Sequence, residues 1–205
     1  MPKKNPPGFC FVGDHPVLDF INTKLSSYDL LKDYPSLLNW LHEAHLLSRE
    51  EALAYEQRWP QAQTDEAAST AIELRSNLMQ LIEKCRNNRP IADTDLNPVN
   101  HLLQDRAVAD KLALMDNRFI VERRLVIRKP VDLLVPIAEA AADLLSANKL
   151  HLVKRCENPK CMHYFYDTSK NGLRRWCSQK TCGNRMRVNA YLQRHRDKQE
   201  AADKD

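Results

Sequence analysis

Four cysteines that lie close together near the end of the chain constrain its fold more than any other feature. They stand in two Cys-x4-Cys pairs, separated by fifteen residues: Cys156 and Cys161, then Cys177 and Cys182. Each pair can supply one edge of a tetrahedron, and a loop of this size turns the chain so that the second pair completes it. The spacing therefore predicts one structural Zn²⁺ held by four thiolates.

Other uses of these cysteines fit the sequence less well. A redox-active pair has two residues between its cysteines, whereas both pairs here have four. An iron–sulfur cluster also takes four cysteines, but the basic, polar surroundings do not single it out. His163 lies between the pairs and could replace one cysteine as a ligand. Four thiolates leave no open position on the metal, so we expect no catalytic role for it.

The segment around the cysteines has too few apolar residues to fold without the metal. A module of about 40 residues rarely buries enough surface to be stable alone. Its aromatic residues are expected to form a small core beside the ion: Tyr164, Phe165, Tyr166 and Trp176. We therefore expect metal binding and folding of this module to be coupled.

The rest of the chain has the hydrophobic spacing of helices. The pattern predicts helices over 17–21, 36–47, 49 to just before 60, 64–87, 97–104 with Pro98 at its first position, and 130–148 with a kink or a new start at Pro136. Ser48 and Glu51 form the pattern of a capping box. The chain has only 4 Gly, which argues against a glycine-rich phosphate loop or an all-β barrel.

Two segments are expected to be extended. Residues 107–128 predict a β-hairpin that turns at Asp116-Asn117, because 119–127 is rich in β-branched residues. A short strand is expected over 150–153. The predicted fold is thus mainly α with a small β-hairpin (α+β). It has a helical N-terminal domain at 1–150, a four-cysteine zinc-finger module at 151–198 that ends in a helix, and an acidic tail at 199–205.

Positive charge is concentrated in the cysteine-rich module. Residues 154–198 hold twelve Lys and Arg against three Asp and Glu, whereas the whole chain has a net charge of +4. Such asymmetry is typical of a surface that binds a polyanion. The candidate nucleic-acid-binding residues are Arg174, Arg175, Lys180, Arg185, Arg187 and Arg194, the last three on the helix expected after Cys182. We expect one or two of these arginines to pair instead with acids of the N-terminal domain.

No apolar run approaches the roughly 20 residues of a membrane helix. No signal-peptide pattern follows the lysines at the start of the chain. Together these features predict a cytoplasmic protein that has no membrane partner.

Several motifs resemble known bacterial families. Residues 165–169, 174–178 and 182–185, the last reading Cys-Gly-Asn-Arg, resemble the CGNR-type zinc finger. The segment Leu-Asp-Phe-Ile-Asn-Thr at 18–23 resembles the opening of the ABATE domain, which commonly precedes this finger. Members of this family are regarded as stress-responsive transcription regulators. The resemblance therefore implies that the finger binds duplex DNA and that the N-terminal domain senses a small molecule.

The residues expected to line an effector site are His15, Asp19 and Asn22. We expect no enzyme, because no nucleophile, phosphate-loop or zinc-protease motif is present. A protein- or RNA-binding zinc module is the alternative to a DNA-binding regulator. A homodimer is compatible with the sequence, but no heptad or symmetric motif marks its surface.

Overall fold

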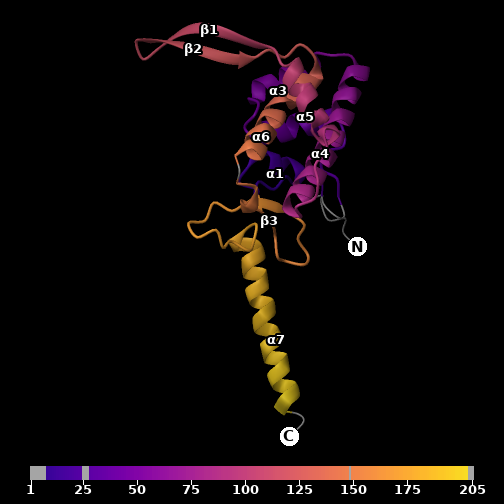
Figure 1. Cartoon of the computed structure of the whole chain (residues 1–205), viewed down its shortest axis with the longest axis vertical. Helices are drawn as coiled ribbons and strands as arrows, with labels where there is room; N and C mark the ends of the chain where they lie inside the picture. The colour runs from indigo at the N-terminus through magenta and orange to yellow at the C-terminus, as the bar shows by residue number, and fades with distance from the viewer. Residues whose placement is uncertain (1–7, 25–27, 148, 203–205) are drawn as a thin grey trace.

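The computed structural model describes residues 8–24, 28–147 and 149–202, apart from the side chains of residues 198 and 200–202. A helical bundle forms the body of the molecule (Figure 1). A two-stranded β-hairpin projects from one end of this body. The cysteine-rich module sits at the opposite end, and a long C-terminal helix extends from it away from the bundle. The fold is mainly helical with a small β-hairpin, as the sequence predicted, and it has a second small antiparallel sheet in the cysteine-rich module.

Six α-helices build the bundle: α1 (Pro16–Ile21), α2 (Tyr34–Glu43), α3 (Arg49–Glu56), α4 (Gln61–Arg86), α5 (Asp93–Asp105) and α6 (Val135–Ser146). Their apolar faces meet in one core, in which α4 contacts α1, α2 and α5. Trp40 and Phe20 are the largest fully buried side chains of this core, and their rings lie 5.0 Å apart. The predicted capping box is confirmed, because the Ser48 side chain accepts from the backbone N–H of Glu51.

The predicted β-hairpin is confirmed as β1 (Val108–Met115) and β2 (Arg118–Leu125). The strands pair antiparallel from Val108 opposite Leu125 to Met115 opposite Arg118. Asp116 and Asn117 form the turn, with φ angles of 49° and 59°. Asn and Asp adopt positive φ more readily than other non-glycine residues, and two successive positive φ angles match the twist of the strands.

Two predicted elements begin elsewhere than expected. The helix predicted from Asn97 begins at Asp93, so that Pro98 lies inside α5 and not at its first position. The Asp95 carboxylate sets this start, because it accepts from the N–H of Ala92 and pairs with Lys84. The expected strand over 150–153 is mostly the 3₁₀ helix η2 (Leu150–Leu152), and only Val153 belongs to a strand.

The predicted helix from Pro130 begins as the 3₁₀ helix η1 (Pro130–Leu134). The α-helical part, α6, follows with Pro136 at its second position. A proline there breaks no helical hydrogen bond, because the first N–H groups of a helix have no intrahelical partner. The predicted end at 148 lies outside the described residues, and α6 ends at Ser146.

The cysteine-rich module contains β3 (Val153–Arg155), β4 (Tyr164–Tyr166), the π-helical turn η3 (Gln179–Gly183) and α7 (Asn184–Ala202). Successive side chains of β4 point to opposite faces, as strand geometry requires. Tyr164 and Tyr166 therefore pack against the helical core, whereas Phe165 packs with the cysteines. The small aromatic core expected beside the metal thus consists of Phe165 and Trp176 only.

The helix expected to end near 198 continues to Ala202. The first part of the predicted acidic tail at 199–205 is therefore helical, and residues 203–205 lie outside the described part. Among the helices of the described residues, none combines the length and apolar character needed to cross a membrane.

Candidate metal centre and basic helix

The four cysteine sulfurs converge at one point of the module. The Sγ atoms of Cys156, Cys161, Cys177 and Cys182 all lie within 4.8 Å of one another. The Sγ of Cys177 is 3.7 Å from that of Cys161 and 3.8 Å from that of Cys182. A tetrahedral Zn²⁺ with Zn–S bonds of about 2.3 Å separates its sulfur ligands by about 3.8 Å. The predicted set of four cysteines therefore fits one structural zinc ion.

The chemistry of the cluster also calls for a cation. Three of the four cysteines are buried, and Cys161 is half-buried. The hydrogen bond to Cys161 Sγ, together with burial and the neighbouring thiols, raises the pKa of the Cys177 thiol. Four thiolates are stable this close together only if a metal ion balances their charge.

His163 is not one of the four converging ligands. Its Nδ1 lies 4.0 Å from Cys177 Sγ, and its backbone carbonyl accepts from the N–H of Cys156. His163 is therefore not needed in place of a cysteine, because four thiolates already complete the coordination shell.

Each cysteine pair is held by a tight turn. In the first pair, the N–H of Cys161 donates to the carbonyl of Asn158, and the Asn158 side chain accepts from the N–H of Lys160. The Asn158 amide then donates to Cys182 Sγ at 3.2 Å and so connects the two pairs. Such outer hydrogen bonds orient metal ligands and moderate the charge on sulfur. Sequence analysis missed Asn158, although an Asn before Pro in a short cysteine loop is a turn signal.

The second pair depends on a close approach at Gly183. Cys182 and Gly183 end η3, whose first N–H groups are capped by the Ser178 hydroxyl. A Cβ atom on Gly183 would lie 2.5 Å from the Gln179 side chain and 3.1 Å from the Trp176 ring. A larger residue would displace the end of the Gln179 side chain and would need the Trp176 ring to shift by a few tenths of an ångström, so the packing here favours glycine.

Arg174 stabilises the finger from within. Its guanidinium lies 4.5 Å from the centre of the Phe165 ring, and its Nε donates to the Trp176 carbonyl at 2.9 Å. It also donates to the Cys177 carbonyl and pairs with Asp14 of the helical domain. These contacts hold the Arg174 side chain within the protein, and its binding to nucleic acid stays a prediction. The expectation that some arginines pair with acids of the N-terminal domain is confirmed.

Arg175 differs from its neighbour because its side chain stays 63% exposed. Its Nε pairs with Glu157 at 2.6 Å, and its guanidinium lies over the Trp176 ring. An exposed ion pair of this kind contributes little to stability and is easily exchanged for a phosphate. Arg175 is thus accessible, although it has a carboxylate partner in Glu157.

The three residues expected to line an effector site are engaged within the protein. The Asn22 amide binds both backbone groups of Tyr164: its Nδ2 donates to the carbonyl at 2.9 Å, and its Oδ1 accepts from the N–H at 2.8 Å. The Asp19 carboxylate accepts from the N–H of Gly13 at 2.7 Å. His15 is the N-cap of α1 and lies beside the Tyr166 ring. The Asn22 bonds and the contact of His15 with Tyr166 join the helical domain to the finger, whereas the Asp19 bond lies within the N-terminal part.

Burial changes the protonation of two of these groups. It raises the pKa of Asp19 to about 6, which the bond from the Gly13 N–H only partly opposes. Burial also lowers the pKa of His15. Both effects favour the neutral form near the interface between the two parts of the chain.

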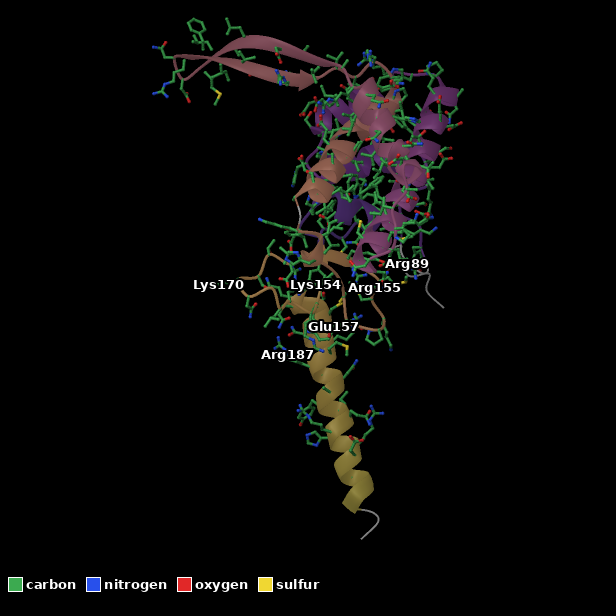
Figure 2. The ribbon with its side chains drawn as sticks, viewed as in Figure 1. Arg89, Lys154, Arg155, Glu157, Lys170 and Arg187 are labelled. Carbon is green, nitrogen blue, oxygen red and sulfur yellow. The ribbon has the colours of Figure 1, made fainter. Side chains whose placement is uncertain are left out.

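The helix α7 presents its cations to solvent. Arg185, Arg187 and Arg194 are exposed, as is Lys180 in η3. Among the side chains that the structure describes, none of these four has a carboxylate at ion-pair distance. Arg187 lies on the first turn of α7, at the end nearest the finger (Figure 2). Val188, Tyr191 and Leu192 are also largely exposed, so the described part of α7 buries no apolar stripe.

The fold and the site define a zinc-finger protein in which a four-cysteine module follows a helical domain. Residues 153–195 match the family model of the CGNR zinc finger. Residues 14–148, more than half of the chain, match the ABATE model, whose description reads "Putative stress-induced transcription regulator". The chain therefore belongs to the ABATE family and carries a CGNR zinc finger. A comparison with curated proteins found no match.

Proposed function

We propose that this protein is a DNA-binding transcription regulator, and not an enzyme, whose finger and α7 bind duplex DNA. The observation that carries the proposal is the exposure of α7. A helix that buries no face against the rest of the chain gains little from packing, and it is stabilised by charge pairs along the helix or by a molecule that it contacts. The exposed arginines of α7 are positively charged, so the molecule that α7 contacts is expected to be an anion such as the DNA backbone.

The arginines of α7 lie on two sides of the helix. Arg187 and Arg194 share one side at a spacing of seven residues, and Arg185 lies on the opposite side. A helix in the major groove of B-DNA runs between two phosphate walls about 12 Å apart. Cations on both sides of α7 therefore meet both walls, which is the arrangement expected of groove binding.

The zinc site supports this use of α7. The thiolate of Cys182 and the π-helical turn η3 directly precede Asn184, where α7 begins. The Asn184 side chain donates to the Lys180 carbonyl and so ties the first turn of α7 to η3. The metal thus fixes the direction in which α7 leaves the finger.

The sensing role of the helical domain stays a prediction. His15, Asp19 and Asn22 are occupied by contacts to the finger or to neighbouring backbone of the N-terminal part, which favours coupling over effector binding. We propose that a signal received by the helical domain reaches the finger through this interface.

The direct test is binding of zinc-loaded protein to fluorescent duplex DNA and to a structured RNA at equal salt. We expect tighter binding to the duplex, and weaker binding by Arg187→Ala. Lys32→Ala is the matched control, because Lys32 is an exposed cation of the helical domain. Equal or tighter RNA binding would favour the RNA-binding alternative, and no binding to either would favour a protein-binding module.

A further inference from the structure

One face of the β-hairpin is apolar and exposed. We call the hairpin formed by β1 and β2 the arm. Residues directly opposite in its register share a face. The exposed fractions on this face are 67% for Leu112, 63% for Leu114, 77% for Phe119 and 64% for Val121. Val108 and Leu125 continue the same face toward the root of the arm.

Nothing in the described part of the chain covers this face. The strands β1 and β2 pack mainly on each other, and the arm stands away from the bundle (Figure 1). A single two-stranded hairpin is marginally stable in water, and contiguous apolar surface usually marks an interaction site. The arm therefore needs a partner that buries its apolar face.

An apolar cleft lies at the root of the same arm. It has a volume of 580 Å³ and is lined by Leu47, Tyr55, Leu125, Ile127 and Leu133, among others. These residues come from the α2–α3 connection, α3, the end of the arm and η1. The chain thus carries both an apolar projection and an apolar recess.

We propose that the arm is a dimerisation device, in which two copies of this chain exchange arms. The two arms lie antiparallel and face to face about a two-fold axis that passes beside the Asp110–Arg123 pair. The tip of each arm enters the root cleft of the other copy. Such a contact is isologous and closes after two subunits.

The register of the arm supports a second copy as the occupant. Asp110 and Arg123 lie opposite each other between the apolar tip and the apolar root, and their ion pair is 2.9 Å long. An axis at this pair sets Leu112 of one copy against Val108 of the other. It also stacks the two Asp110–Arg123 pairs, so that each Asp110 carboxylate has the Arg123 guanidinium of the other copy diagonally across the axis. It also sets Phe119 against Ile127, which lines the cleft.

The charges of the tip and the cleft are complementary as well. The tip carries Asp116 and Arg118, and the cleft carries Glu51 and Arg124. The tip and the cleft thus each offer one acid and one base at the border of the apolar contact, as in the polar rim of an interface. Within one copy Arg124 pairs with Glu122, and Glu51 accepts from the Ser48 N–H. The arm as a whole is close to neutral, so it lacks the charge that a nucleic acid would require.

Sedimentation equilibrium of the zinc-loaded full chain tests the proposal. We expect a dimer at micromolar concentration, and Phe119→Ser to raise the dimer dissociation constant roughly tenfold or more. Met115→Ser is the matched control, because Met115 is 60% exposed at the tip but lies on the other face. Circular dichroism and zinc content should stay unchanged in both variants.

A pair of charge variants tests the position of the axis. Two Asp110 and two Arg123 side chains surround the axis in the wild-type dimer, and their charges balance. Asp110→Arg alone or Arg123→Asp alone leaves four like charges there, and each should weaken the homodimer. A mixture of the two variants places opposite charges across the axis, and it should form a heterodimer tighter than either homodimer.

Two outcomes would overturn the proposal. One is a wild-type protein that is monomeric at these concentrations, which would leave the apolar face to a different protein partner. The other is a dimer that Phe119→Ser does not weaken. Neither outcome depends on DNA binding, so the proposed function is tested separately.

Discussion

The side-chain amide of Asn22 binds both backbone groups of Tyr164, a residue 142 positions further along the chain. Tyr164 lies on β4, opposite Arg155 of β3. The neighbouring residues Cys156 and His163 are hydrogen-bonded to each other, and hydrogen-bonded pairs alternate with non-bonded pairs along an antiparallel ladder. The N–H and carbonyl of Tyr164 therefore point away from β3. The Asn22 amide therefore takes the place of a third strand at the free edge of the sheet. Through this contact α1 holds the strand that carries Phe165 beside the zinc site.

Asn22→Ala should destabilise the protein by about 2–4 kcal/mol, because it leaves two buried backbone groups of Tyr164 without partners. Urea unfolding of the zinc-loaded protein measures the effect. The control is Asn39→Ala, which removes an exposed amide bonded to Glu43 and should change the free energy of unfolding by less than about 0.5 kcal/mol. Equal effects of the two variants would show that the Asn22 contact does not hold the finger.

Arg174→Ala should lower the free energy of unfolding by about 2–3 kcal/mol, because it removes the Phe165 contact and several half-buried hydrogen bonds. Arg174→Lys should be nearly as harmful, since a lysine keeps the charge but cannot reproduce the planar fork. Arg187→Ala, in contrast, should leave the stability within about 0.5 kcal/mol. Full stability of Arg174→Lys would point to a role based on charge alone.

Asp19→Asn should change how stability depends on pH. The pKa of Asp19 is raised to about 6 in the folded protein, so the folded state binds a proton more tightly than the unfolded state. Ionisation of Asp19 therefore costs stability as the pH rises from about 4 to about 6, and the cost is constant above this range.

Asp19→Asn lacks this cost, because its side chain does not ionise. The amide oxygen of the new side chain can still accept from the Gly13 N–H. The stability of the variant relative to the wild type should thus rise by about 1 kcal/mol between pH 5 and pH 7. Urea titrations at several pH values measure the difference. A difference that does not change with pH would contradict a raised pKa for Asp19.

Cys177→Ser should abolish stoichiometric zinc binding and unfold the finger, whereas the helices α1 to α6 remain folded. Metal analysis and circular dichroism report the two effects. Cys85→Ser is the control, because Cys85 lies outside the cluster, and that variant should keep one zinc ion per chain. Full zinc occupancy in Cys177→Ser would exclude the four-thiolate site.

Features that depend on nearby residues could be predicted from the sequence. The cysteine spacing predicts the metal site because each pair needs only one short turn. The arm follows from its β-branched residues and from the tolerance of Asp116 and Asn117 for positive φ. The capping box at Ser48 is equally local.

Contacts between distant segments could not be predicted in this way. Arg174 is indistinguishable in sequence from Arg175, yet only Arg174 meets Asp14, which is 160 positions away. Asn22 looked like a residue of a ligand site because it is polar within an apolar motif, and its partner lies on a strand of the finger. The start of α5 likewise depends on Lys84 of a different helix.

The salt dependence of duplex DNA binding tests the central claim most directly. The exposed cations Lys180, Arg185, Arg187 and Arg194 predict a log–log slope of about −3.6, at about 0.9 per phosphate contacted. Arg187→Ala should reduce the magnitude of this slope by about one. A triple change of the three α7 arginines to Ala should leave a slope near about −1, with the zinc content and folding unchanged. A wild-type affinity that does not vary with salt, or a slope that the triple variant leaves intact, would contradict DNA binding by α7.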